Sequence, residues 1–502
     1  MPRIARVFLV LLTILAVVRA TAFLVYAGFR LSLPGEVWYL EPKMVHLAWR
    51  FQEGVRLYPP WRDYPHVANF FGPGYSGLVG LIGRLVNADL DGLTRIGRAV
   101  TLACGLLTSL ILGLATARER GVRIGFLVAA LSLGSGAMIG FGLMVRADTM
   151  AGLLGVIGLL IVVEGRGRSW IFAVLPFVLA CFTKQTAATY VVASVCALVS
   201  QRRWSDAIGM ILTIASILAG ITLGITRWGD PMFAASLLGE SQTPWRWISW
   251  IEVVGKLLFH SPDLLVIPLA GFIFWIEDRP AMRGRMAASL VLLVLNMVAI
   301  GKHGADLNYF LDLRIVQAWA IACFLACDWP RLSPHRSRIK AGAILVSALS
   351  LVPSSVWMLE EARDAVKLAI FYQSEKGRTF VSARGEIEAL VADRSLRVLT
   401  DSSYLQARMK DRAEFGDPWL FRVQVDAGLI RPSRMELDLE RGCYDWIITM
   451  RDLFAPRDPS DENSLPRPLL YRARERYRFV EEKAGLYHYS RSRPADASCS
   501  GQ

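Results

Sequence analysis

Long apolar segments recur along the first 358 residues, and they constrain the fold more than any other feature of the chain. They run for roughly 15 to 22 residues, the length at which an α-helix spans or nearly spans the hydrocarbon core of a bilayer. Over all 502 residues, 54% of the side chains are hydrophobic and the mean hydropathy is +0.38. The sequence therefore predicts an α-helical polytopic membrane protein that is surrounded by the lipid bilayer.

Basic clusters lie between alternate apolar segments and predict their orientation. Examples are Arg3 with Arg6, the stretch ARERGVR at 117–123 and the stretch EDRPAMRGR at 277–285. Because Lys and Arg close to membrane spans remain in the cytoplasm, every second loop is expected inside, and the N-terminus with them. Topology thus explains the formal net charge of +13, and nucleic acid is not expected as a partner.

One apolar segment, residues 70–86, would invert every later basic cluster if it crossed the membrane. As a short re-entrant or interfacial helix on the outer side, it restores the alternation. About eleven spans then remain, and the C-terminus is expected outside. The predicted spans are 7–27, 97–115, 124–145, 149–163, 170–182, 187–200, 207–226, 264–276, 286–300, 313–328 and 341–358.

After Met358 the composition becomes that of an ordinary soluble segment. Strand-like patterns at 396–401, 444–450 and 478–490 alternate with helical patterns, which predicts a small α/β domain. The predicted organisation is a transmembrane domain over 1–358, an extracytoplasmic α/β domain over 359–490 and a disordered tail over 491–502. A first outer loop, 28–96, is expected to hold an amphipathic helix on the membrane surface and the re-entrant helix.

Cysteine and metal-ligand patterns add little. The seven cysteines are scattered, without a CxxC pair or a His at metal-ligand spacing, and we expect them to be core thiols. The sequence therefore assigns no metal ligand and leaves a divalent-metal requirement open.

Polar residues gather in the predicted outer loops, where the chemistry is expected. Each has a structural explanation as well, because loop acids are often merely solvated, ion pairs close helix ends and lysines extend to headgroups. Arg19 lies inside the first span, where a charge costs roughly 2.5 kcal/mol or more, so it should face the bundle and a partner. The loop candidates are Glu36, Glu41, Arg146, Asp148, Lys184, Gln185, Lys302, Asn308 and Tyr309.

The order of these features resembles the GT-C superfamily of integral-membrane glycosyltransferases. Within it, the chain is similar to the bacterial branch of protein O-mannosyltransferases and lipopolysaccharide-core glycosyltransferases. The resemblance rests on EGVRLYPP at 53–60, NFFGPGYSG at 69–77, RADTMAGLL at 146–154, FTKQTA at 182–187 and LNYFLDL at 307–313. It extends over most of the membrane part and implies a bacterial inner (plasma) membrane location.

The resemblance implies roles for individual residues. Family members carry an acidic residue in the first outer loop, often an Asp-Glu pair, ahead of a Gly that precedes Leu-Tyr. Glu41 matches this position, but Leu40 stands where the Asp would be, which leaves Glu36 as a competitor. Arg146 and Asp148 match an Arg-Pro-Asp step with Ala in place of Pro. The TKQT and Asn-Tyr elements match Lys184, Gln185, Asn308 and Tyr309.

The implied reaction transfers a sugar from a polyprenyl-phosphate donor to a hydroxyl of a glycan, lipid or protein acceptor. One carboxylate, Glu41 or Glu36, would act as general base in a single inverting displacement, since the phosphate leaves without needing an acid. Lys184, Arg146 and Lys302 would hold the lipid phosphate. The competing hypotheses are a secondary transporter, for which no paired repeats are found, and a non-catalytic assembly or sensory protein.

Overall fold

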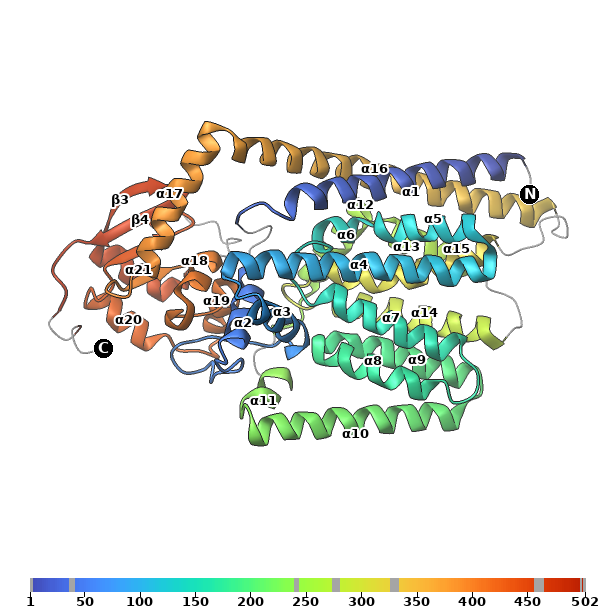
Figure 1. Ribbon diagram of the computed structural model, residues 1–502, viewed down its shortest axis with the longest axis horizontal. Coiled ribbons are helices and arrows are strands. Elements are labelled where there is room, and N and C mark those ends of the chain that lie inside the picture. The colour runs from blue at the N-terminus through green and yellow to red at the C-terminus, as the bar shows by residue number, and fades with distance from the viewer. Residues whose placement is uncertain are drawn as a thin grey trace.

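The computed structural model describes residues 3–35, 41–238, 243–272, 280–325, 334–455 and 465–496, together with Cys499. Helices run side by side along the long axis of the molecule, and a smaller domain, coloured orange to red, lies at one end (Figure 1). The N-terminus lies at the other end of the helices. Below, the helix bundle is the part within residues 3–373, and the outer domain is the part within residues 374–496.

Apolar helices build the bundle, and the predicted polytopic helical fold is confirmed. Among the described residues, five helices are long and apolar enough to cross a membrane, or six if α12 and α13, bent by 86°, form one span. The five are α1 (Arg3–Arg30), α4 (Leu90–Arg120), α10 (Trp204–Trp228), α14 (Pro280–Ala299) and α16 (Pro334–Gln373). Further bundle helices are α5 (Val122–Leu133), α6 (Gly136–Phe141), α7 (Asp148–Glu164), α8 (Trp170–Thr183), α9 (Ala188–Ser200), α12 (Trp247–His260), α13 (Asp263–Phe272) and α15 (Leu313–Leu325).

Within the described residues, the predicted spans fall on these helices, with two differences. Residues 273–276 and 326–328 of the predicted spans lie outside the described residues, and the number of spans stays a prediction. The segment predicted over 124–145 is split at Gly134, between α5 and α6. A Cβ at Gly134 would lie 2.7 Å from the backbone nitrogen of Ala20, so the break lets α1 approach closely. The loop predicted after Arg227 is partly helical, because it contains α11 (Phe233–Leu238) and the amphipathic α12.

Arg19 lies inside the bundle and has the partner that its depth requires. Its Nη2 donates to Oδ1 of Asp263 over 3.0 Å, and both side chains are fully buried. The second carboxylate oxygen of Asp263 accepts from Nε2 of Gln317 over 2.8 Å. This network joins α1, α13 and α15, so the expected buried ion pair also fixes how three helices pack.

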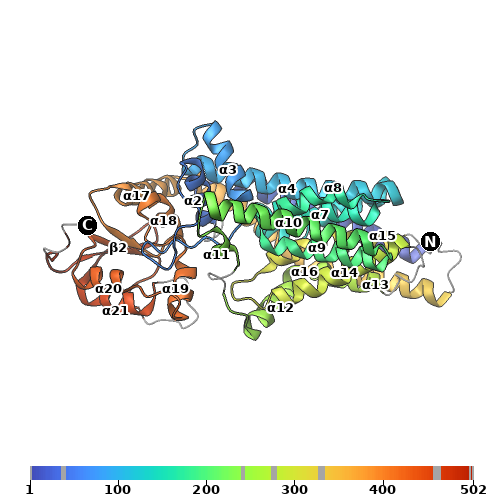
Figure 2. The same ribbon diagram turned by 90° about the horizontal axis from the view of Figure 1, so that it is seen from below.

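The first outer loop contains two short helices at the outer-domain end of α4 (Figures 1 and 2). They are α2 (Glu41–Gln52) and α3 (Pro73–Leu85). With 13 residues, α3 is shorter than the 20 or so that a membrane span needs. Residues Glu41 to Arg50 of α2 are all buried. The helix packs against α3, α4 and the outer domain, and its expected place on the membrane surface stays a prediction.

The outer domain is an α/β unit with a four-stranded sheet in the order β1-β2-β4-β3. The strands β1 (Val398–Thr400), β2 (Trp446–Thr449), β3 (Tyr477–Lys483) and β4 (Leu486–Arg491) confirm the strand patterns read from the sequence. β1 pairs with β2 in parallel, and the other neighbours are antiparallel. The helices are α17 (Glu375–Ala392), α18 (Ser403–Met409), α19 (Pro418–Asp426), α20 (Ser433–Glu440) and α21 (Arg467–Arg476).

The first outer loop is built into the outer domain. Trp61 is completely buried and belongs to the same apolar cluster as Leu399, Ile447 and Tyr489 of the sheet. The backbone N–H of His66 donates to the carbonyl of Glu414 over 2.9 Å. The two parts of the molecule therefore share a core rather than only touching at their surfaces.

Two cysteines of the outer domain are not core thiols as expected. Cys443 and Cys499 form a disulfide, with their Cα atoms 5.3 Å apart. Cys104, Cys181 and Cys196 are free and at least half-buried, and Cys323 is buried. The disulfide attaches part of the predicted tail, 491–502, to the outer domain, although 497–498 and 500–502 lie outside the described residues.

Candidate functional site

A cavity of about 710 Å³ lies where the bundle meets the outer domain. Its walls come from residues 70–71 of the first outer loop, the breaks before α7 and α9, the segment 302–309 and the start of α19. Of the nine loop candidates read from the sequence, six line it: Arg146, Lys184, Gln185, Lys302, Asn308 and Tyr309. Segments far apart in the sequence thus bring their polar residues to one place.

Asp148, the first residue of α7, lies beneath the cavity and organises it. One carboxylate oxygen accepts from Nε of Arg146 over 2.9 Å. The other accepts from Nζ of Lys184 and from Nδ2 of Asn308, each over 2.5 Å. Because Asp148 binds three cavity residues, it acts as an anchor that sets their positions, and its oxygens are occupied by these partners.

The helix ends just before Lys184, and the Thr-Lys-Gln motif at this point packs against the glycine-containing motif of the first outer loop. Lys184 has an extended backbone conformation between α8 and the 3₁₀ turn Gln185–Ala187. Its side chain lines the cavity. A Cβ at Gly72 would lie 1.8 Å from the carbonyl oxygen of Phe182, so only glycine fits there. Gln185 donates from Nε2 to the carbonyl of Phe70 over 2.5 Å. The first outer loop is thereby fastened to the end of α8.

The cavity carries more positive than negative charge. Arg146 and Lys184 share the single carboxylate of Asp148. Lys302 lines the same cavity, and among the described residues no carboxylate pairs with it. Burial, with a contribution from the Lys184 ammonium, lowers the pKa of Lys302 below its usual range. Asp417 also lines the cavity, but it is paired with Lys43, so Asp148 is left to face three cations. This excess of positive charge would be relieved by a bound anion.

Aromatic rings form much of the remaining wall. The Lys184 ammonium lies 4.8 Å from the ring centroid of Tyr309, and the Lys302 ammonium lies 5.9 Å from that of Phe70. Trp419, from the outer domain, packs against His303 with 5.3 Å between ring centroids. Such rings both favour cations and offer flat apolar faces to a ligand. The cavity therefore suits an anionic group attached to a partly apolar body.

Glu41 lies outside this cavity. Arg98 of α4 binds it with two parallel hydrogen bonds, Nε to Oε1 over 2.9 Å and Nη2 to Oε2 over 2.7 Å. The backbone N–H of Val145 also donates to Oε1, over 3.2 Å, and both charged side chains are only 1% exposed. The catalytic role of Glu41 stays a prediction. The competing candidate, Glu36, lies outside the described residues.

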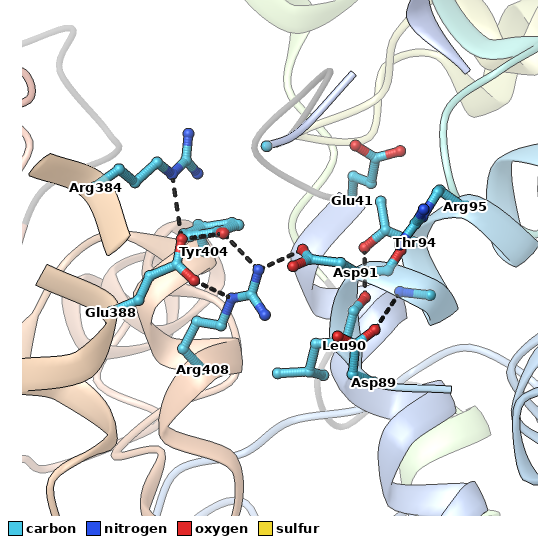
Figure 3. Close-up of polar contacts among 12 residues, drawn as sticks. Glu41, Asp89, Leu90, Asp91, Thr94, Arg95, Arg384, Glu388, Tyr404 and Arg408 are labelled. Atoms are coloured by element: carbon cyan, nitrogen blue, oxygen red, sulfur yellow. Dashed lines mark hydrogen bonds and ion pairs between the residues drawn. The ribbon is translucent and has the colours of Figure 1, made fainter. Parts of the chain in front are cut away.

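Glu41 instead borders a smaller pocket of about 330 Å³ between α2, α4 and α18. Figure 3 shows Arg408 of the outer domain between Asp91 of the bundle and Glu388 of α17. The Tyr404 hydroxyl accepts a hydrogen bond from the same guanidinium. The charged side chains here have partners of opposite charge, so this pocket is a contact between domains.

Several residues at the main cavity were not predicted. Lys43 and Asp417 form an ion pair over 3.1 Å, and Trp419 and Phe70 line the wall. Asp417 had a local signal, since Asp before Pro418 is typical of a helix start, but this indicates a cap and not a site. No three His, Cys, Asp or Glu residues within the described ranges are placed to hold a metal ion. A metal requirement thus stays open, without candidate ligands.

The sequence matches no protein-family model and no curated protein. Solved structures are similar in fold. ArnT from Cupriavidus metallidurans, bound to undecaprenyl phosphate, aligns with a TM-score of 0.57 and 13% identity over 96% of this chain and 98% of its own. The Archaeoglobus fulgidus oligosaccharyltransferase, tethered with an acceptor peptide, aligns at 0.54 and 11% identity over 95% and 74%. The AglB oligosaccharyltransferase from the same organism, with an inhibitory peptide and a dolichol-phosphate, aligns at 0.52 and 12% over the same shares.

The chain has the GT-C fold of membrane glycosyltransferases. Its bundle and its outer domain both take part in the match, because 96% of the chain aligns with ArnT. The resemblance inferred from the ordered motifs is therefore confirmed at the level of the fold. In this GT-C fold, the cation-lined cavity lies between the two parts.

Proposed function

We propose that the protein is a membrane glycosyltransferase that moves a sugar from a polyprenyl-phosphate-linked donor to an acceptor hydroxyl at the outer face of the membrane. The reaction would be a single inverting displacement, assisted by one carboxylate as general base. The observation that carries this proposal is the excess of cations at the cavity. Lys302, with Arg146 and Lys184, provides charge that the described carboxylates do not balance.

The location of these cations suits a lipid-linked phosphate. They lie at the end of the bundle that carries the outer domain, where a phosphate at the bilayer surface can reach them while its polyprenyl chain remains among lipids. Charge-assisted hydrogen bonds from Lys and Arg would stabilise the negative charge that grows on the leaving phosphate. Among structures of the same fold, ArnT was solved with undecaprenyl phosphate and AglB with dolichol-phosphate.

The proposed orientation places the outer domain outside the cytoplasm, with the N-terminus inside and the protein in a bacterial inner membrane. Two features support it. The connections from α4 to α5, from α7 to α8 and from α9 to α10, which carry basic residues, lie at the end of the bundle away from the outer domain (Figure 1). The Cys443–Cys499 disulfide suits an oxidising compartment, such as the periplasm.

Binding of undecaprenyl phosphate to the purified protein in detergent tests the phosphate site. We expect wild-type protein to bind it, and not undecaprenol, which lacks the phosphate. Lys184→Ala should weaken binding by roughly 1–3 kcal/mol, the range for a lost charge-assisted hydrogen bond. Lys256→Ala is the matched control, because Lys256 is 47% exposed and does not line the cavity.

Equal affinity for undecaprenol, or no effect of Lys184→Ala, would contradict the phosphate site. Catalysis needs a second assay, in which the protein consumes undecaprenyl-phosphate-linked sugars from a panel of hexoses and pentoses. Binding without consumption of any donor would instead favour the non-catalytic alternative.

A further inference from the structure

The cavity contains one carboxylate among its described lining residues, and it comes from the outer domain. This is Asp417, which immediately precedes α19. Trp419, two residues further on, lines the same wall and packs so closely on Gly304 that a Cβ there would lie 2.4 Å from the indole. The bundle thus contributes cations to the cavity, while the outer domain contributes an acid and an aromatic face.

Two contacts hold the Asp417 carboxylate in place. Oδ1 accepts from the backbone N–H of Leu420 over 3.2 Å, which caps α19. Oδ2 accepts from Nζ of Lys43 over 3.1 Å, and both side chains are at most 3% exposed. A carboxylate has about four acceptor positions, so positions remain for a hydroxyl donated from the cavity.

The Asp417 carboxylate forms an ion pair with the Lys43 ammonium. Burial lowers the pKa of Lys43, and the neighbouring Asp417 opposes this shift. Because the pair is neutral as a whole, it leaves the positive charge of the bundle wall available for an anion. The acid is therefore available for proton transfer without cancelling the phosphate site.

Glu41 differs in each of these respects. Arg98 occupies both of its oxygens, Val145 donates to one of them, and the side chain lines the smaller pocket instead of the cavity. A hydroxyl bound in the cavity would meet Asp417 and not Glu41. The site of the missing first-loop Asp, Leu40, lies outside the described residues.

We propose that Asp417 is the general base that accepts the proton of the acceptor hydroxyl, a role that rests on the function proposed above. The hydroxyl oxygen forms a bond to the anomeric carbon of the donor sugar as its proton passes to Oδ2 or Oδ1 of Asp417. The bond from the anomeric carbon to the phosphate oxygen breaks, and its electron pair remains on the polyprenyl phosphate. Lys302 and Lys184 stabilise that charge, and Asp417 later releases its proton to water.

Asp417→Asn tests the assignment, because Asn keeps the shape and the helix cap while removing the basic oxygen. With an undecaprenyl-phosphate sugar that wild-type protein consumes, we expect turnover to fall at least 100-fold. The affinity for undecaprenyl phosphate should stay within twofold. Asp426→Asn, at the exposed end of the same helix, is the matched control and should leave turnover unchanged.

The variant Lys43→Met distinguishes a catalytic role of Asp417 from a purely structural role of its ion pair with Lys43. It breaks the same contact but leaves the Asp417 carboxylate, so the loss in turnover should be at least tenfold smaller than in Asp417→Asn. Equal losses in the two variants would mean that the ion pair only docks the domains, and would overturn the proposal. If Asp417→Asn does not fold, Asp417→Ser, which also caps a helix, replaces it.

The outcomes separate this inference from the proposed function. An active wild-type protein in which Asp417→Asn retains turnover within threefold overturns the role of Asp417 alone. A 100-fold loss in Glu41→Gln without a loss in Asp417→Asn would assign the base to the first outer loop. A wild-type protein that neither binds undecaprenyl phosphate nor consumes any donor overturns the proposed function, and this inference with it.

Discussion

The main cavity and the Glu41 pocket both lie between the bundle and the outer domain, but they differ in whether their charged side chains have partners of opposite charge. At Glu41, the carboxylate and the guanidinium of Arg98 satisfy each other, and Arg98 also donates to the carbonyls of Arg30, Leu33 and Gly35. At the cavity, Lys302 has no acidic partner among the described residues. A buried charge with a complete set of partners holds the fold together, whereas the half-buried charge of Lys302 is available to a ligand.

The largest expected effect follows from removing one half of the compensated pair. Arg98→Met leaves the Glu41 carboxylate buried without its cation, which should lower the free energy of unfolding by about 3–5 kcal/mol. Thermal unfolding of the purified protein in detergent measures this loss. Arg95→Met, on an exposed part of the same helix, is the control. A loss no greater than the control would show that Glu41 and Arg98 are not a structural pair.

Glu414 extends the comparison to a buried acid without a close ion pair. It accepts a hydrogen bond from the Tyr444 hydroxyl over 3.1 Å, and burial raises its pKa from 4.5 to about 7. The folded protein therefore binds this proton more tightly than the unfolded chain, and the free energy of unfolding should fall as the pH rises from about 4.5 to 7.

Glu414→Gln should remove this pH dependence. Above pH 7 it should stabilise the protein by up to about 3 kcal/mol, since each pKa unit corresponds to about 1.4 kcal/mol. Melting temperatures of both proteins across this pH range provide the measurement. Parallel curves for variant and wild type would show that another group causes the pH dependence.

Lys302 is expected to give the smallest effect on stability and a distinct effect on binding. Lys302→Met removes a cation that repels Lys184, so the free energy of unfolding should change by less than about 0.5 kcal/mol. The affinity for undecaprenyl phosphate should nevertheless fall by roughly 1–3 kcal/mol. A clear loss of stability in this variant would remove the contrast between the two regions.

The sequence allowed many helices of the bundle to be predicted, because an apolar segment of sufficient length encodes a helix locally. It also identified Arg146, Asp148, Lys184 and Asn308, which meet at one carboxylate. The partner of Glu41 was not predictable, since Arg98 lies 57 residues away and no local pattern connects them. Glu41 was selected by its place in a motif, and a motif does not show which cavity a side chain faces.

Residues from the outer domain were missed for a related reason. The ion pair of Lys43 and Asp417 joins positions 374 residues apart, and it exists only because the outer domain docks on α2. The periodicity of apolar residues predicted the strands of that domain, but not where the domain packs on the bundle. The break between α5 and α6 was missed because it depends on the close approach of α1 at Gly134, which is a tertiary contact.

The burial of Trp61 in the core of the outer domain affects how the chain folds during synthesis and how its domains can be exchanged between proteins. The core of this domain needs a side chain that is synthesised more than 300 residues before the sheet it packs on, as the positions of Trp61 and Leu399 show. During synthesis, the Trp61 side chain therefore has no core to pack in until the strands of the sheet have been made. For the same reason, the outer domain cannot be exchanged on its own. A chimaera that carries the outer domain of another protein must also carry the matching first outer loop.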